Sequence, residues 1–149
     1  MRALIQRVTN ASVSVDKKLI NEIENGLLIF LGIKIGDTNE DAEYLAYRCA
    51  NLRIFNDENE KMNLSVKDVN GSALVISQFT LYGDTLKGHR PSYTEAAQPE
   101  LAEKLYEYFV GKLRGELGNE KVKTGIFRAT MEIRLVNDGP VTVMVESKS

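Results

Sequence analysis

The order of apolar and polar residues in the first half of the chain predicts several strands. Residues 1–8 are strand-like, and residues 11–15 alternate small or apolar side chains with polar ones, which is the period of a half-buried strand. Residues 27–33 and 73–79 are continuous apolar runs instead. Because a strand that is covered on both faces has no polar face, both runs predict central strands of a sheet.

Two further strands are predicted near the C-terminus. Residues 131–136 alternate again, with their apolar side chains on one face. Residues 141–145 are also strand-like and follow the turn signal Asn137-Asp-Gly-Pro140. The pattern therefore predicts that the last two strands form a hairpin or a corner.

Two segments carry apolar residues at helical spacing. Thr38 with Asp41 three positions later resembles a capping box, so the first helix is expected to begin there. Pro99 is typical of the first turn of a helix, and Gly115 and Gly118 are expected to end the second one. The expected apolar stripes are Ala42, Leu45, Ala46, Cys49 and Leu52 in the first helix and Leu101, Leu105, Tyr108, Phe109 and Leu113 in the second.

The order strands, helix, strand, loop, helix, strands predicts an α+β fold. We expect a mixed, mostly antiparallel sheet with two main helices packed on one side. The length of 149 residues fits one domain over residues 1–149. The longest apolar run, residues 26–33, is far below the roughly 20 residues of a membrane span. Because the N-terminus does not resemble a signal peptide, no membrane association and a cytoplasmic location are expected.

Charge and residue counts narrow the classes of function. Nineteen Lys and Arg against 21 Asp and Glu give a net charge of -2, which excludes a protein that coats nucleic acid through many phosphate contacts. A protein that grips a small part of a nucleic acid is still allowed. With one cysteine, Cys49, and one histidine, His89, the chain has no intramolecular disulfide and no zinc site of several Cys or His ligands. No metal or other cofactor is expected, and Cys49 is interpreted as a buried small hydrophobe.

The first segment with candidate chemistry begins where a central strand ends. Residues 77–84 leave the apolar run and enter a Gly-containing loop, where folds often present reactive groups. Ser77 or Thr80 can act as a nucleophile, and backbone N–H groups of the turn can hold an oxyanion. The plainer interpretation is that both hydroxyl groups satisfy backbone groups at the end of the strand.

Three basic side chains follow in the same loop. Lys87, His89 and Arg90 lie within four positions and surround Gly88. A Ser–His pair is one interpretation, and a phosphate contact is another. A solvated basic loop is the plainest of the three.

Two motifs together resemble the D-aminoacyl-tRNA deacylase family, also called D-tyrosyl-tRNA deacylase. They are Ser77-Gln-Phe-Thr-Leu81 and Asn137-Asp-Gly-Pro-Val-Thr142. One stretch departs from the family pattern: the family often has Phe-Gly-Ala, and this chain has Phe127-Arg-Ala129, followed by Thr130. Supporting matches follow one another along nearly the whole chain: Gln6-Arg-Val8, Ala11-Ser-Val13, Gly26-Leu-Leu28, Leu52-Arg-Ile-Phe55, Lys61-Met-Asn-Leu64 and Arg90-Pro-Ser92.

The resemblance implies an enzyme that hydrolyses the ester between a D-amino acid and the 3′-terminal adenosine of tRNA. It implies a catalytic segment made of Ser77, Gln78, Phe79 and Thr80, in which amide groups near Gln78 and Phe79 bind the developing oxyanion. The terminal 2′-hydroxyl of the tRNA is expected to assist the attacking water. A nucleophilic role of Thr80 is the less favoured alternative.

The resemblance also implies how the substrate is bound. The protein is expected to be a homodimer, with the Gly139-Pro140 bond cis and inserted into the partner's active site, where it rejects L-residues. Phe127 and Met131 are further expected substrate-binding residues. The basic side chains Lys87 and Arg90 are expected to hold the acceptor end of the tRNA. Glycine has no side chain to reject, so glycyl-tRNA is an expected second substrate.

Two other functions stay open at the level of the sequence. The chain can be a non-catalytic module of the same fold that binds RNA ends, if Arg128 blocks the pocket. It can also be a related deacylase with a trans Gly139-Pro140 bond that acts on L-aminoacyl-tRNA. A direct hydrolysis assay separates all three.

Overall fold

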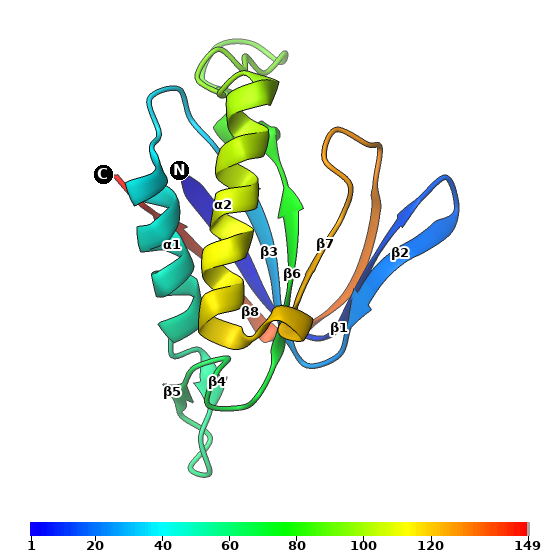
Figure 1. Ribbon diagram of the computed structural model, residues 1–149, viewed down its shortest axis with the longest axis vertical. Coiled ribbons are helices and arrows are strands. Elements are labelled where there is room, and N and C mark those ends of the chain that lie inside the picture. The colour runs from blue at the N-terminus through cyan, green and yellow to red at the C-terminus, as the bar shows by residue number, and fades with distance from the viewer. Residues whose placement is uncertain (149) are drawn as a thin grey trace.

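The computed structural model describes residues 1–148, in which two long helices lie on one face of a six-stranded sheet (Figure 1). The predicted α+β class is therefore confirmed. The strands of the sheet follow the spatial order β2-β1-β3-β6-β7, and β8 pairs with the other side of β1. The elements are β1 (Arg2–Val15), β2 (Lys18–Ile23), β3 (Gly26–Gly32), α1 (Asn39–Asn51), β4 (Phe55–Asn56), β5 (Met62–Leu64), β6 (Ser72–Ser77), the 3-10 turn η1 (Phe79–Tyr82), α2 (Pro99–Leu117), the 3-10 turn η2 (Asn119–Lys121), β7 (Val122–Thr124) and β8 (Glu132–Glu146).

The long strand β1 organises the antiparallel part of the sheet. Its first half, from Arg2 to Val8, pairs with β3, and its second half pairs with β2. The strand β8 runs antiparallel along the other side of β1 over almost its whole length. The pairs β3–β6 and β6–β7 are parallel. The mixed, mostly antiparallel sheet that the sequence predicts is thus confirmed.

The prediction of a hairpin or corner near the C-terminus is wrong. Residues 132–146 form one strand, and both halves of that strand pair with β1. At residues 137–140 the pairing of β8 with β1 is irregular, since the register of the two strands shifts on both sides of Val8. The turn residues therefore bulge within a strand instead of reversing the chain.

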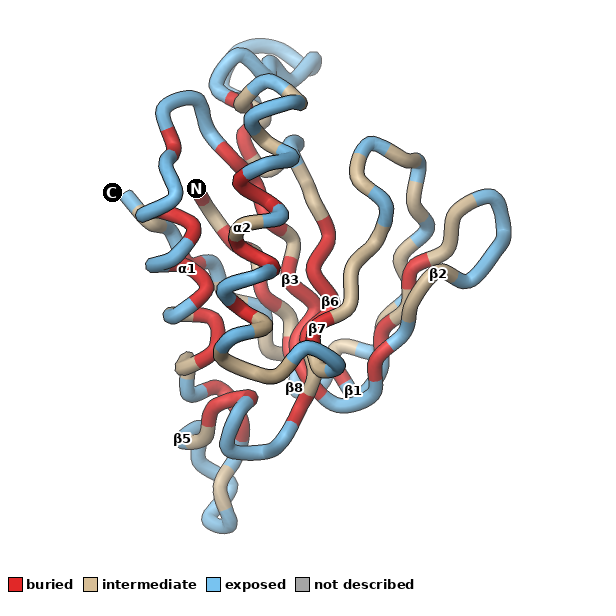
Figure 2. The backbone as a smooth tube through the Cα atoms, viewed as in Figure 1, coloured by how far each residue is buried: buried red, intermediate tan, exposed pale blue. Residues whose placement is uncertain are grey.

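The buried apolar residues form two clusters. Buried stretches run along the strands of the sheet and along both helices (Figure 2). The larger cluster lies between the sheet and the helices and includes Ile5, Leu45 and Phe109, which are fully buried. The smaller cluster, with Val13 and Leu74, lies on the other face, where the sheet curls. The curl brings β2 toward β7, and the Asn21 side-chain amide donates to the Thr124 carbonyl at 2.6 Å.

The helix signals of the sequence are largely confirmed. The backbone N–H of Thr38 donates to the Asp41 carboxylate at 2.8 Å, so the expected capping box opens α1. Pro99 stands in the first turn of α2. The prediction that Gly115 helps to end this helix is wrong: α2 continues to Leu117 and ends before Gly118, which has a φ of 108°. Gly115 lies on an open surface, where a missing side chain is tolerated.

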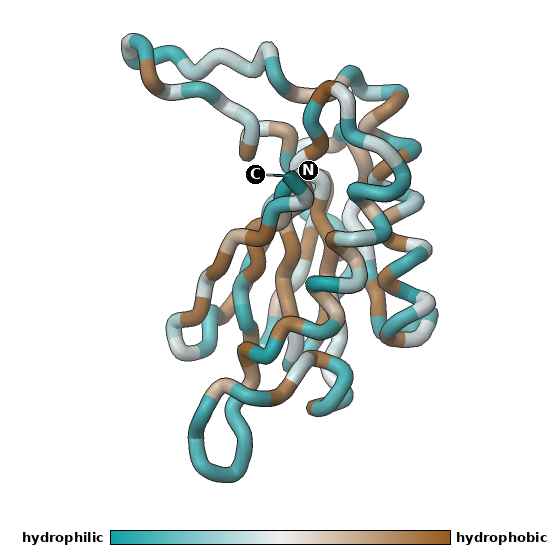
Figure 3. Tube along the Cα trace, turned by 90° about the vertical axis from the view of Figure 1, so that its left-hand side faces the viewer, coloured by the Kyte–Doolittle hydropathy of each residue, from teal (hydrophilic) through white to brown (hydrophobic). Residues whose placement is uncertain are grey.

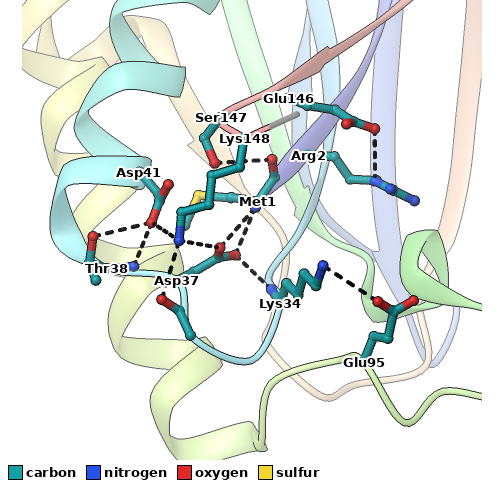
Figure 4. A network of polar contacts seen from close by, with 11 residues as sticks. Met1, Arg2, Lys34, Asp37, Thr38, Asp41, Glu95, Glu146, Ser147 and Lys148 are labelled. Carbon is teal, nitrogen blue, oxygen red and sulfur yellow. Dashed lines mark hydrogen bonds and ion pairs between the residues drawn. The ribbon is translucent and has the colours of Figure 1, made fainter.

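A polar network ties both ends of the chain to the start of α1 (Figure 4). The amino group of Met1 contacts the buried Asp37 carboxylate at 2.9 Å, and that carboxylate also accepts the backbone N–H of Lys34. Lys148 reaches Asp41 at 3.2 Å. Burial alone would raise the pKa of Asp41, but hydrogen bonds led by that from the Thr38 backbone hold it below its usual range.

One segment projects from this body. Residues 83–95, between η1 and α2, extend from the upper end of the molecule as drawn in Figure 1, and the view turned by 90° shows the projection most clearly (Figure 3). Backbone hydrogen bonds between Asp84 and Ser92, at 2.7 and 2.9 Å, close its base. Within residues 1–148, no helix has the length and apolar character needed to cross a membrane.

Candidate functional site

A cavity of about 580 Å³ lies where β6 ends, α2 begins and the loop between β7 and β8 passes over. Three of the four predicted catalytic residues, Ser77, Gln78 and Phe79, line it. Two of the predicted substrate-binding residues, Phe127 and Met131, line it from the β7–β8 loop. The other lining residues are Leu31, Ile33, Tyr93, Ala96, Ala97, Gln98, Pro99, Ala102, Arg128 and Ala129.

The turn after β6 lies beside this cavity. Ser77 pairs in parallel register with Leu31, and the N–H of Gln78 donates to the Leu31 carbonyl at 2.8 Å. The chain then enters η1, so Phe79 and Thr80 carry the leading N–H groups of a short helix. Leading N–H groups have no partner inside their own helix, and they are therefore available to an anionic oxygen.

The side chains of this turn are placed around its backbone. The side-chain amide of Gln78 donates to the Thr80 hydroxyl. The Phe79 ring is 56% exposed and packs edge-to-face on Tyr93, with the ring centroids 5.2 Å apart. Thr80 is exposed and does not line the cavity. Its hydroxyl is thus engaged beside the cavity and does not point at a bound group from its wall.

The opposite wall is supported from the core. The Tyr106 hydroxyl donates to the carbonyl of Val75 in β6 at 2.7 Å, and the Tyr106 ring packs against Phe127 with the centroids 5.9 Å apart. Burial raises the pKa of Tyr106 above its ordinary value, so this hydroxyl stays a neutral donor. Arg128, next to Phe127, has a φ of 70°, in the left-handed region that favours glycine.

The basic residues of the projecting segment lie apart from the cavity. Lys87 and Arg90 are exposed near its tip, with His89 between them, and none of the three lines the cavity. No Ser–His pair is formed by Ser77 and His89 among the hydrogen bonds of residues 1–148. The interpretation of this loop as a solvated basic segment fits the structure, and a contact with tRNA stays a prediction.

The Gly139-Pro140 segment is pinned from β1. The guanidinium of Arg7, which is almost fully buried, donates to the carbonyls of Ile54 at 2.8 Å and Asp138 at 3.2 Å. The Asn137 side-chain amide donates to the carbonyls of Arg7 and Val141, both at 3.0 Å. The Gly139-Pro140 bond is cis, Gly139 has a φ of 130°, and both residues are exposed.

Within one chain, this segment does not meet the cavity. Arg7, which contacts Asp138, pairs with Leu27 at the start of β3, whereas Ser77 pairs with Leu31 near its end. Four residues of strand separate these two levels, which is about 13 Å. The structure therefore brings Ser77, Gln78, Phe79, Phe127 and Met131 together, but places Gly139, Pro140, Lys87 and Arg90 elsewhere.

Several residues of the site carried no clear signal in the sequence. The small side chains that open α2, such as Ala96 and Ala97, line the cavity only because the chain returns from the projecting segment at this point. Arg7 and Asn137 belong to recognisable motifs, but their anchoring role depends on long-range pairing that no local pattern shows.

The remaining titratable candidates are outside the cavity. Cys49 is fully buried, and burial raises the pKa of its thiol to about 12, which confirms its interpretation as a small hydrophobe. Among residues 1–148, no group of three or more His, Cys, Asp or Glu side chains could hold a metal ion.

The same fold and a similar chain occur in known proteins. Residues 4–146 match the family described as D-Tyr-tRNA(Tyr) deacylase. The D-aminoacyl-tRNA deacylase of Thermosipho africanus is 57% identical over 148 residues, which cover 99% of this chain and 98% of the relative. The D-aminoacyl-tRNA deacylase of Flavobacterium psychrophilum is 54% identical over 149 residues, covering 100% and 99%.

Two solved structures agree with this. One, described as "c-Myc DNA Unwinding Element Binding Protein", has a TM-score of 0.95 and 41% identity over 100% of both chains. Another, described as a probable eukaryotic D-amino acid tRNA deacylase, has a TM-score of 0.82 at 17% identity, covers 97% of this chain and 98% of its own, and shows the shared fold. The molecule therefore has the deacylase fold. The chain belongs to the D-Tyr-tRNA(Tyr) deacylase family, whose members are hydrolases of the aminoacyl-tRNA ester.

Proposed function

We propose that the protein hydrolyses the ester between a D-amino acid and the 3′-terminal adenosine of tRNA. The observation that carries the proposal is the mainly apolar cavity beside the backbone turn of Gln78 and Phe79. Such a cavity can enclose an aminoacyl group or a base, while the turn offers N–H donors to the ester carbonyl. The family membership supports the same substrate class. A cytoplasmic location is proposed together with this substrate.

The proposed reaction uses water and backbone donors. The water oxygen attacks the ester carbonyl carbon, and the backbone N–H of Phe79, which leads η1, stabilises the negative charge that develops on the carbonyl oxygen. The neighbouring N–H of Gln78, which was also expected to bind this oxygen, already donates to the Leu31 carbonyl. The bond from this carbon to the 3′-oxygen of the adenosine then breaks. The 3′-oxygen takes up a proton, and the products are the free D-amino acid and tRNA.

The attacking water needs a base, and the cavity wall offers none. Of the lining residues described above, none is Asp, Glu, His or Lys. The Thr80 hydroxyl is engaged by Gln78 outside the wall. We propose, as the family resemblance implies, that the neighbouring 2′-hydroxyl of the terminal adenosine, which the substrate itself brings in, assists the attacking water.

Discrimination against L-residues is proposed to come from a second copy of the chain. Gly139 and Pro140 are exposed, fixed by Arg7 and Asn137, and too far along the sheet to reach the cavity of their own chain. A homodimer lets this segment enter the partner's cavity. Its carbonyls would then occupy the space that an L side chain needs, so that the wrong enantiomer is rejected by a clash. Glycine has no such side chain, and glycyl-tRNA is a proposed second substrate.

The sheet offers a surface for this dimer. On the face away from the helices, Leu4 stands directly opposite Phe30 and Met144 in the strand pairing. Leu4 and Phe30 are half-buried, and Met144 is exposed. An apolar patch on an open sheet face is typical of a surface that a partner covers. The projecting Lys87 and Arg90 are proposed to contact the phosphates of the acceptor end.

The proposal is tested by ester loss from D-tyrosyl-tRNA with either a ribose or a 2′-deoxyribose at its 3′ end. We expect rapid hydrolysis of the ribose form and a rate lower by roughly a hundredfold or more for the deoxy form, which is the usual loss for a missing general base. No hydrolysis of either form, with intact binding of the tRNA end, would identify a non-catalytic RNA-end-binding module instead. Equal rates would refute the role of the 2′-hydroxyl.

A further inference from the structure

One charged side chain lines an otherwise uncharged cavity. The walls consist of aliphatic and aromatic side chains with Ser77 and two glutamines, and Arg128 carries their single formal charge. Arg128 belongs to the loop between β7 and β8, where the Ala129 N–H donates a hydrogen bond to the Ile126 carbonyl at 3.2 Å. Arg128 therefore stands on a defined turn beside the cavity, and the residue is exposed.

This guanidinium has no partner within residues 1–148. The ion pairs and side-chain hydrogen bonds of that part of the chain use Arg2, Arg7, Arg48, Arg114 and Arg134, and Arg128 makes none. Its backbone has a φ of 70°, which an L side chain adopts at a cost. In the same part of the chain the exposed Arg53 and Arg90 make no such contacts either, so what sets Arg128 apart is its place in the cavity wall together with a backbone conformation that favours glycine, and this combination points to a function in binding.

We propose that Arg128 is a specificity-determining residue that binds an anionic oxygen of the substrate in this cavity. The proposal rests on the proposed deacylase function. A guanidinium offers a planar set of N–H donors that matches a carboxylate or a phosphate with two parallel hydrogen bonds. The net charge of -2 means that the protein as a whole does not attract anions, so the attraction is local to this side chain.

The anionic oxygen has two possible sources in an aminoacyl-tRNA. It is the side-chain carboxylate of an acidic D-residue such as D-aspartate, or the phosphate on the 5′ side of the terminal adenosine. In the first case Arg128 widens the range of D-residues toward acidic ones. In the second it positions every tRNA end in the same way, whichever amino acid is attached.

The test uses ligands that cannot be hydrolysed, so that binding is measured apart from turnover. Two ligands are RNA minihelices that end in 3′-amino-adenosine and carry a D-aspartyl or a D-tyrosyl group through an amide bond. Two smaller ligands are 3′-amino-adenosine itself with a D-tyrosyl amide, one with a 5′-phosphate and one without it. Dissociation constants are measured for the wild type, Arg128→Gln and Arg128→Lys. Arg53→Gln is the matched control. It removes the same charge from an exposed arginine that follows α1 and does not line the cavity.

If Arg128 contacts a carboxylate, Arg128→Gln should weaken the binding of the D-aspartyl minihelix about tenfold or more and that of the D-tyrosyl minihelix less than about twofold. If Arg128 contacts the phosphate, both minihelices should lose about tenfold in affinity. The D-tyrosyl nucleoside should then lose affinity only in the form that carries the 5′-phosphate. Arg128→Lys recovers part of the loss in either case, because the charge returns without the fork of donors.

Two results would overturn the inference. One is that Arg128→Gln binds all ligands as tightly as Arg53→Gln does. The other is an equal loss for the D-tyrosyl nucleoside that lacks the phosphate, which would mean that Arg128 shapes the cavity and binds no anion. Hydrolysis of D-tyrosyl-tRNA by the wild type is followed separately, and its absence would refute the proposed function without altering the binding result.

Discussion

Arg2 is predicted to hold in place the turn η1, which we propose as part of the catalytic site. Its guanidinium donates to the Leu81 carbonyl at 2.9 Å and lies over the Tyr82 ring at 4.3 Å, so two of its contacts are with η1. Its third contact, with Glu146 at 3.2 Å, is an ion pair between partly exposed groups that lacks good hydrogen-bond geometry. Arg2→Met keeps most of the stem of the side chain and removes all three contacts.

The magnitude follows from these contacts. A hydrogen bond from a charged donor contributes about 1.5–3 kcal/mol and an exposed cation–π contact about 0.5–1 kcal/mol. The ion pair adds at most about 1 kcal/mol, because solvent screens it. We expect Arg2→Met to lower the free energy of unfolding by about 2–5 kcal/mol. Glu146→Gln removes only the ion pair and should cost less than about 1 kcal/mol.

The assay combines urea unfolding with the hydrolysis of D-tyrosyl-tRNA at a temperature where both variants are folded. Arg2→Met should lower kcat more than it raises KM, because the turn that we propose to stabilise the transition state becomes loose while the cavity walls stay in place. Glu146→Gln should leave kcat close to the wild-type value. An unchanged kcat in folded Arg2→Met, or an equal loss in Glu146→Gln, would refute the assignment of Arg2 to the turn.

Four further predictions concern other parts of the molecule. Gly139→Ala places a Cβ 2.8 Å from Val141 Cγ2 and 2.9 Å from the Val141 backbone N, at a φ of 130°. We therefore expect the free energy of unfolding to fall by about 1–3 kcal/mol and the ratio of D-ester to L-ester hydrolysis rates to decrease. Thr80→Ala should keep most of the activity, whereas a drop to background in a folded variant would make Thr80 the nucleophile. The pKa of Asp41 is lowered in the folded protein, so the ionised carboxylate stabilises the fold above the ordinary carboxyl pKa of about 4, and this stabilisation is lost as the pH falls below that value. In Asp41→Asn, the free energy of unfolding should therefore fall less steeply with decreasing pH in the acid range. A chelator should leave hydrolysis unchanged when the tRNA is kept folded, and restoration of a lost activity by a divalent ion would contradict this.

The sequence predicts the elements well where a local pattern determines them. The apolar runs of β3 and β6 and the Thr38–Asp41 capping box are visible in any short window, because periodicity and capping act over a few residues. The turn signal at residues 137–140 misleads for the opposite reason. Whether such residues reverse the chain or bulge within a strand depends on the partner strand, and β1 is long enough to pair with both halves of β8.

The site shows the same division. The motif around Ser77 predicts which residues meet at the cavity, because they lie at the end of one strand. The positions of Arg2 and Arg7 as supports of the η1 turn and of the Gly139 segment depend on contacts across 79 and 131 positions of sequence, which no local pattern contains. The second copy of the chain, which would join both segments into one site, is expected from the family resemblance alone and from no local pattern of this sequence.

The most direct test of the proposed function is a comparison of D-tyrosyl-tRNA with L-tyrosyl-tRNA in parallel hydrolysis reactions with the purified protein. We expect the protein to release the D-amino acid rapidly, while the L-ester disappears no faster than it does in buffer alone. Hydrolysis of the L-ester at a rate similar to that of the D-ester would contradict the rejection of L-residues by Gly139 and Pro140, and an intact D-ester would contradict the assigned activity itself.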